Sequence, residues 1–96
     1  MKPYKFHPAA RAEMNDAAAY YDSQQENLGR RFLVSVQDAI NKIRINPQLY
    51  PATGFDARRC LTKTFPFGII FRDMPERIVI VAVMHLHREP DYWATR

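Results

Sequence analysis

Two histidines and an arginine stand close together near the end of the chain. His85 and His87 are two residues apart on a segment that reads as extended, so both side chains should point to one face, with Arg88 adjacent. Cleavage of RNA without a metal needs a base, an acid and cations that stabilise the developing negative charge. A histidine with an ordinary pKa of about 6.5 can serve as the acid or the base. One interpretation of this segment is therefore catalytic.

Arginines elsewhere could bind the phosphate in such a site, with Arg59 and Arg72 as candidates beside Arg88. The alternative interpretation is structural, because histidines at the end of a strand often only hydrogen-bond to their neighbours. In that case Arg88 would pair with a carboxylate close to it. The acidic candidates for this pairing are Asp73, Glu89 and Asp91. The sequence leaves both interpretations open.

The other reactive side chains do not suggest a metal or cofactor site. Three histidines occur without a convergent pattern of carboxylates or cysteines, so no metal site and no cofactor are expected. The single cysteine, Cys60, excludes an internal disulfide, fits a reducing compartment and reads as a core residue.

The length limits the protein to one domain, and the net charge favours an acidic partner. The 96 residues leave no room for a second core, and 47% hydrophobic with 25% charged residues is ordinary for a globular chain. A net charge of +4 and a pI near 9.5 favour nucleic acid or an acidic protein as partner. No signal peptide is evident, and the apolar run at residues 78–84 is far shorter than the ~20 residues of a membrane span. We therefore expect a cytoplasmic protein with no membrane contact.

The first half of the chain predicts a helical hairpin. Residues 4–6 suggest a short strand, and Pro8 suits the first position of a helix that the apolar spacing extends to about residue 25. The apolar stripe of this helix is small and rich in alanine, so its neighbour can approach closely. Asn27 is a suitable N-cap for a second helix that Asn46-Pro47 should end. Two helices so joined should fold back on each other.

The second half predicts strands. Residues 53–55 read as a loop, and strands are expected at residues 58–62, 65–72 and 77–85, with a turn at residues 73–76 between the last two. The fold class is therefore α+β: a short N-terminal strand, then an antiparallel helical hairpin packed on a three-stranded antiparallel meander.

The last predicted strand, at residues 77–85, is apolar on both faces, which a strand with one wet face would not be. The helical hairpin can cover one face, so the C-terminal segment or another chain must cover the other. Tyr92 and Trp93 fit two roles here, because they could cap this face or remain exposed as an anchor for a partner.

These features together resemble the ParE/RelE superfamily of toxins from type II toxin–antitoxin (plasmid stabilisation) systems. The resemblance rests on landmarks in the right order along nearly the whole chain. They are Ala18-Tyr20-Tyr21, Leu28-Gly29-Arg31-Phe32, Asn46-Pro47, Phe65-Pro66-Phe67, the strand at residues 78–83 and a final H-x-x-R-x-P-x-x-W ending at Trp93. The resemblance implies a toxin that a cognate antitoxin neutralises.

The superfamily has a branch that cuts mRNA in the ribosome and a branch that poisons DNA gyrase. The ribonuclease branch carries an arginine directly after an aromatic residue in a G-x-Y-R strand motif, but here Gly68 follows Phe67. That branch also has a C-terminal tyrosine or histidine, which falls near Tyr92 or Trp93, and an indole cannot exchange a proton in this way. The resemblance is therefore closer to the ParE branch and implies DNA gyrase as the target.

Two rival functions remain at this stage. One is a ribosome-dependent mRNA endonuclease that uses Arg59, His85, His87 or Arg88. The other is a non-toxic, antitoxin-binding co-repressor that reaches operator DNA only within the antitoxin complex. Partner contacts are expected at Tyr92 and Trp93 and at basic residues that would attract an acidic antitoxin segment. These basic residues are Arg30, Arg31 and Arg58.

Overall fold

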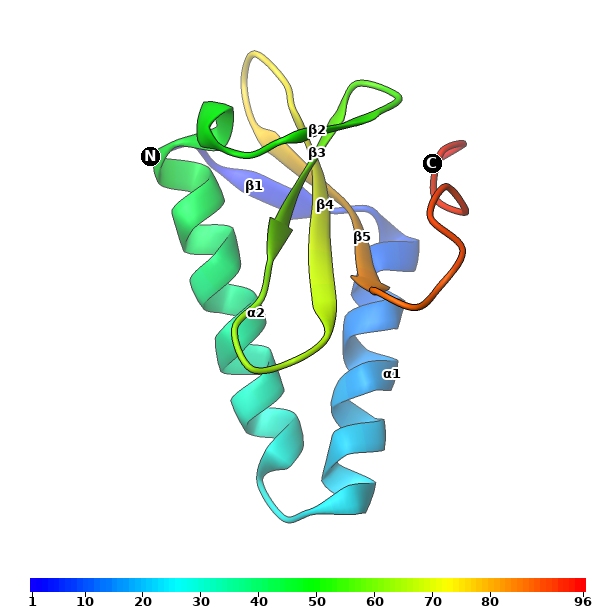
Figure 1. The fold of residues 1–96 in the computed structure, drawn as a ribbon. Coiled ribbons are helices and arrows are strands. Elements are labelled where there is room, and N and C mark those ends of the chain that lie inside the picture. The colour runs from blue at the N-terminus through cyan, green and yellow to red at the C-terminus, as the bar shows by residue number, and fades with distance from the viewer.

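The computed structural model describes residues 1–96 and contains two long helices and one mixed sheet (Figure 1). Along the chain the elements are β1 (Tyr4–Phe6), α1 (Pro8–Gln24), α2 (Leu28–Ile45), the 3₁₀ helix η1 (Pro47–Leu49), β2 (Ala52–Gly54), β3 (Ala57–Leu61), β4 (Phe67–Asp73) and β5 (Ile78–His85). The sheet order is β1-β5-β4-β3-β2. Strand β1 runs parallel to β5, and every other neighbouring pair is antiparallel.

This architecture confirms the predicted α+β class, the helical hairpin and the antiparallel meander of β3, β4 and β5. The sheet is larger than predicted, because residues 52–54 form the edge strand β2. The prediction of a loop at residues 53–55 was therefore wrong. A hairpin turn follows directly, with Phe55 and Asp56 both at positive φ (55° and 58°). Positive φ at both central residues is typical of tight hairpin turns, but a phenylalanine gives no signal for it.

Helix α2 begins and ends near the predicted residues, although its start is capped differently. Asn27 is the N-cap residue, but it lies in the left-handed region at φ 64° and its side chain makes no capping hydrogen bond. The carboxylate of Asp22 instead accepts a hydrogen bond from the Gly29 N–H at 2.8 Å. The helix ends at Ile45, directly before Asn46-Pro47, as the sequence predicts.

The small residues of α1 allow the two helices to approach closely. A methyl group added to Gly29 would overlap the carbonyl oxygen of Ala18, so only glycine fits this crossing. Figure 1 shows the helices joined at the bottom of the view and spreading apart toward β1. Neither helix is long and apolar enough to cross a bilayer.

The core has two parts, one on each face of the sheet. The first part lies between the helices and the sheet and includes Phe32, Ile40, Ile43, Ile69, Phe71 and Ile80. The second lies on the opposite face and consists of Ala57, Ile70, Val81, Ala82, Met84 and Trp93. Strand β5 therefore buries both faces, as predicted, and the chain's own C-terminal segment covers the second one. An uncovered sheet face is no longer an argument for a partner.

Candidate functional site

Glu13 on α1 ties the C-terminal segment to the edge of β5. Its carboxylate accepts two hydrogen bonds from the Arg96 guanidinium, at 2.9 and 3.1 Å, and one from Arg88 at 3.3 Å. The same carboxylate accepts the backbone N–H of Val83 at 3.1 Å. The Arg96 guanidinium also donates to the carbonyl oxygen of Val81 at 3.0 Å. The pair is largely buried, with side chains 14% (Glu13) and 16% (Arg96) exposed.

The Glu13–Arg96 ion pair makes the hydrogen bonds to β5 that one more residue of a neighbouring strand would make. Strand β1 pairs with β5 only as far as Ile80, because the chain turns into α1 at Pro8. Beyond Ile80, the backbone groups of β5 that point to this edge are the Val81 C=O and the Val83 N–H. In a parallel sheet, both would bond to a single residue opposite Ala82 on the neighbouring strand. Here the Arg96 guanidinium donates to the Val81 carbonyl, and the Glu13 carboxylate accepts from the Val83 N–H. The edge of β5 is thus closed to pairing where β1 ends.

The remaining contacts of the C-terminal segment correct one prediction. Arg88 pairs with Glu13 and not with Asp73, Glu89 or Asp91, and its guanidinium lies 3.7 Å from the centre of the Tyr92 ring. Asp73 bonds instead to Lys2 and Gln48. Arg72, one of the predicted phosphate ligands, donates to the backbone oxygens of Phe55 and Arg96 at 3.0 and 2.8 Å. Both arginines therefore hold the chain end in place.

Trp93 caps the second face of the sheet. It is 1% exposed, and its ring meets that of Phe55 edge-on with centroids 5.9 Å apart. The interpretation of Trp93 as an exposed anchor is therefore wrong for this structure, whereas Tyr92 is half-buried. The indole Nε1 is buried without a hydrogen-bond partner. Such a group costs about 1–3 kcal/mol.

The environment of Tyr92 predicts a loss of stability at alkaline pH. Burial raises the pKa of Tyr92, and the nearby Glu13 carboxylate raises it further, although Arg88 and Arg96 act in the opposite direction. The unfolded chain therefore releases the phenolic proton first, at a pH of about 10. The free energy of unfolding should be fully retained below this pH and fall above it. Urea unfolding between about pH 8 and pH 11 should give a smaller decline for Tyr92→Phe.

The range below about pH 8 provides the control for this experiment, because the Tyr92 phenol is protonated there in the folded and the unfolded chain, and the difference in free energy of unfolding between the two proteins should stay constant. Equal slopes for Tyr92→Phe and the unmodified chain would contradict the assignment.

The two histidines lie together at the end of β5. The strand ends at His85, and a turn follows, so the segment is not extended as predicted. The rings are nevertheless adjacent, with centroids 5.2 Å apart, because the His87 N–H donates to Nδ1 of His85 at 3.1 Å. The His85 ring also packs edge-on against Phe67, with centroids 5.1 Å apart. These contacts match the structural interpretation of the segment.

The sheet places Arg59 and His85 on opposite faces. His85 is paired with Phe67, which belongs to the helix-facing core, whereas Arg59 is paired with Ile70, which belongs to the opposite face. The Arg59 side chain runs across Gly68, where an added methyl group would lie 3.1 Å from Cδ. The structure therefore brings the two histidines together, whereas Arg88 is engaged by Glu13 and Arg59 lies on the face opposite His85.

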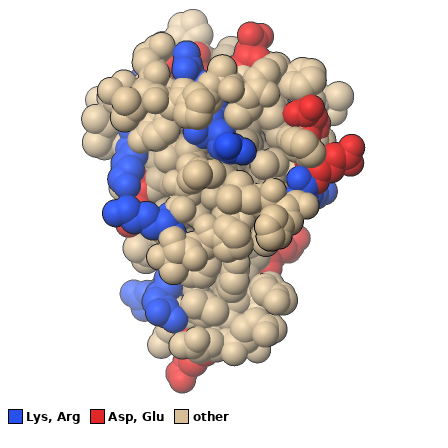
Figure 2. All heavy atoms as spheres, viewed as in Figure 1, with Lys and Arg blue, Asp and Glu red and all other residues tan.

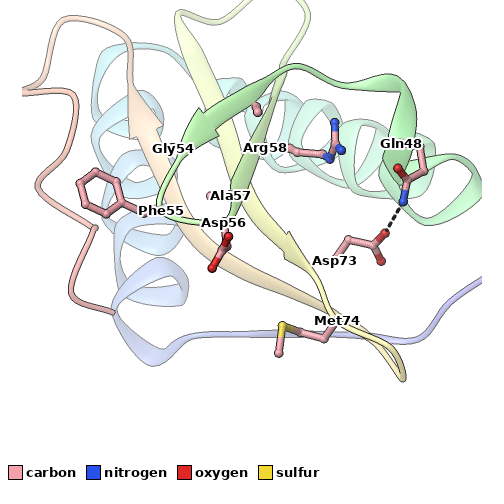
Figure 3. Close-up of a pocket in the computed structure, with 9 residues that line it drawn as sticks. Gln48, Gly54, Phe55, Asp56, Ala57, Arg58, Asp73 and Met74 are labelled. Atoms are coloured by element: carbon pink, nitrogen blue, oxygen red, sulfur yellow. Dashed lines mark hydrogen bonds between the residues drawn. The ribbon is translucent and has the colours of Figure 1, made fainter.

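The predicted partner-binding arginines occupy different surfaces. Arg30 and Arg31 are exposed on α2. Arg58 lies on β3, where it donates to the carbonyl oxygen of Tyr50 at 2.7 Å and lines a hollow of about 670 Å³ (Figure 3). This hollow also contains Asp56 and Asp73, so its charge is mixed. Nowhere do three or more histidine, cysteine or acidic side chains gather as they would around a metal ion.

Charge is spread over the sheet face without forming one basic groove. In Figure 2, blue side chains run down the left border, red ones gather on the right, and most of the middle is uncharged. Sequence reasoning missed Glu13, whose carboxylate accepts hydrogen bonds from Val83, Arg88 and Arg96. Its partner Arg96 is 83 positions away, so no local spacing could reveal the pair.

Comparison with known proteins now places the chain. Residues 4–90 match the family described as the ParE toxin of the type II toxin–antitoxin system parDE. The chain belongs to the ParE toxin family. No protein of curated function matches it in sequence. Among solved structures, a chain of the chromosomal ParDE toxin–antitoxin system from P. aeruginosa has the same fold at 19% identity, with a TM-score of 0.65. The alignment covers 91% of this chain and 98% of that one.

Proposed function

We propose that this ParE-family chain stops growth by binding DNA gyrase, and that a cognate antitoxin neutralises it. The observation that carries the proposal is the separation of Arg59 from His85 across the sheet. A metal-free ribonuclease needs its acid, base and cations around one phosphate. Arg88 is bound to Glu13, Gly68 stands in place of the motif arginine, and no side-chain hydrogen bond joins the histidines to Arg59 or Arg88, which supports a mechanism other than cleavage. A toxin that acts by binding does not need these groups around one phosphate.

The antitoxin part of the proposal follows from the family and from charge. The family is described as the toxin of a type II toxin–antitoxin system. The net charge of +4 favours an acidic partner segment, and opposite charge accelerates such an encounter. Contact with operator DNA would then occur only through the antitoxin complex. A role in plasmid stabilisation and a cytoplasmic location belong to the same proposal.

Induced expression in a bacterial host tests the proposal. Growth should stop, cells should form filaments, and purified protein should inhibit supercoiling by DNA gyrase in vitro. Messenger RNA should remain intact at the time of arrest. Rapid loss of mRNA with unchanged gyrase activity would instead favour the RelE-type endonuclease, and normal growth would favour the non-toxic co-repressor.

A double variant separates the two toxic mechanisms. His87→Ala together with Arg88→Ala removes the exposed histidine and the nearby cation, so it should abolish toxicity of a nuclease. Under the proposed mechanism it should leave gyrase inhibition within about two-fold, provided that circular dichroism shows a folded protein. Lys63→Ala is a matched control, because this exposed lysine lies between β3 and β4 and is neither a catalytic nor a partner-binding candidate.

A further inference from the structure

Arg59 on β3 is half-buried, yet its guanidinium has no partner. Each of the other half-buried arginines donates a hydrogen bond to a backbone carbonyl oxygen; they are Arg44, Arg58, Arg72 and Arg96. The Arg59 guanidinium makes neither a hydrogen bond nor an ion pair with the rest of the chain. A charge withdrawn from water is costly unless it is paired. The donors of this guanidinium are therefore free for a group outside the chain.

Gly68 on β4 allows the Arg59 side chain to lie flat across the sheet. A methyl group added to Gly68 would lie 3.2 Å from Cγ and 3.1 Å from Cδ of Arg59. Gly68 is buried, and Leu86 also lies over it, with Cδ2 at 3.5 Å from the same methyl position. A glycine inside a strand often marks such a close approach. The stem of Arg59 is confined, so the guanidinium has less freedom to lose on binding.

Two exposed leucines flank this arginine. Leu61 follows Arg59 by two residues and is paired with Gly68, so its side chain lies on the same face of the sheet. Leu61 is 54% exposed and Leu86 is 37% exposed. Both lie where Figure 1 shows β3 and β5 ending toward the bottom of the view, beyond the part of this face that Trp93 covers. Arg59, Leu61 and Leu86 together form what we call the Arg59 patch.

We propose that the Arg59 patch binds a carboxylate that stands between apolar side chains on the surface of the target protein. The guanidinium would donate to both carboxylate oxygens, a planar geometry that suits arginine. Leu61 and Leu86 would pack against the apolar neighbours of the carboxylate and exclude water from the pair. The patch would be a contact of the toxin with DNA gyrase, and in that respect the inference rests on the proposed function.

Nucleic acid and a second copy of the chain are less suitable occupants. Nucleic-acid interfaces are polar and strongly basic, whereas this patch combines one cation with two leucines. A symmetric dimer built on the patch would bring the two Arg59 side chains together, and like charges facing each other across an interface are unfavourable. A carboxylate on a different protein meets neither obstacle.

The affinity of the purified chain for immobilised DNA gyrase tests the proposal. Arg59→Glu should weaken binding by about ten-fold or more, and Arg59→Lys by about three-fold, because lysine keeps the charge but not the paired donors. Leu61→Ser should weaken binding by about five-fold. Arg77→Gln, in the exposed turn between β4 and β5, should leave the affinity unchanged. Unchanged affinity for Arg59→Glu would overturn the inference and leave the proposed function intact.

Thermal unfolding separates binding from a structural role of the arginine. Because the guanidinium has no partner within the chain, Arg59→Gln should unfold at the same temperature as the unmodified chain or at a higher one. A clear fall in the unfolding temperature would show that Arg59 serves the fold and would overturn the inference.

An NMR titration without gyrase decides the inference even if the proposed function fails. With a short capped peptide that carries one glutamate between two leucines, the Arg59 Nε–H signal and the methyl signals of Leu61 and Leu86 should shift in a saturable way. The same peptide with glutamine should bind about five-fold more weakly. The absence of these shifts would overturn the inference. Tighter binding of a single-stranded oligonucleotide, or concentration-dependent shifts without any ligand, would also overturn it and assign the patch to nucleic acid or to a second copy.

Discussion

Glu13→Gln is expected to lower the free energy of unfolding by about 3 kcal/mol, because it leaves the largely buried Arg96 guanidinium without its counter-charge. Glutamine has nearly the same size as glutamate, so the effect would come from charge and not from packing. The loss should also release the chain end from the edge of β5, since the hydrogen bonds to Val81 and Val83 depend on this pair. Urea unfolding at neutral pH measures the change.

Two further variants define the origin of that effect. Asp16→Asn on the exposed side of α1 should stay within about 0.5 kcal/mol of the unmodified chain. Adding Arg96→Met to Glu13→Gln should recover part of the lost stability, because it removes the uncompensated charge. A Glu13→Gln chain as stable as the original would show that the pair does not hold the C-terminal segment.

Trp93→Ala is expected to cost about 3–5 kcal/mol, because the indole fills the second core. Trp93→Phe should cost clearly less. It keeps an aromatic ring against Phe55 and removes an indole N–H that has no hydrogen-bond partner. Thermal unfolding followed by circular dichroism gives the order of the variants.

Tyr20→Ala is the comparison for this truncation, because Tyr20 is 60% exposed and its loss should be nearly neutral. Equal stability of Trp93→Ala and Tyr20→Ala would mean that the C-terminal segment does not cover the sheet in solution.

The sequence was most informative where structure depends on short-range rules. Pro8 and Asn46-Pro47 mark helix boundaries within one residue, because proline restricts the backbone wherever it stands. Strand β2 was missed because it has only three residues and precedes a turn built on Phe55 at positive φ. Neither a strand of three residues nor a turn with phenylalanine at positive φ can be recognised from the residue types.

The candidate site could be predicted less well, because it depends on pairing between distant strands. The side of the sheet on which Arg59 and His85 lie follows from the register that pairs Arg59 with Ile70 and His85 with Phe67. Alternation counted along each strand gives no register between strands, so the sequence alone could not place these two residues on opposite faces. The fold brings His85 and His87 together but places Arg59 on the face opposite His85.

The central place of β5 determines when the molecule can form during synthesis. This strand is the last in the chain, yet it lies between β1 and β4 and contributes to both cores. Until residues 78–85 leave the ribosome, β1 has no neighbour and neither core is complete. Pairing across such a sequence separation is slow to form. A chain truncated before residue 78 would therefore lack the strand on which β1 and both cores depend, and it should not fold.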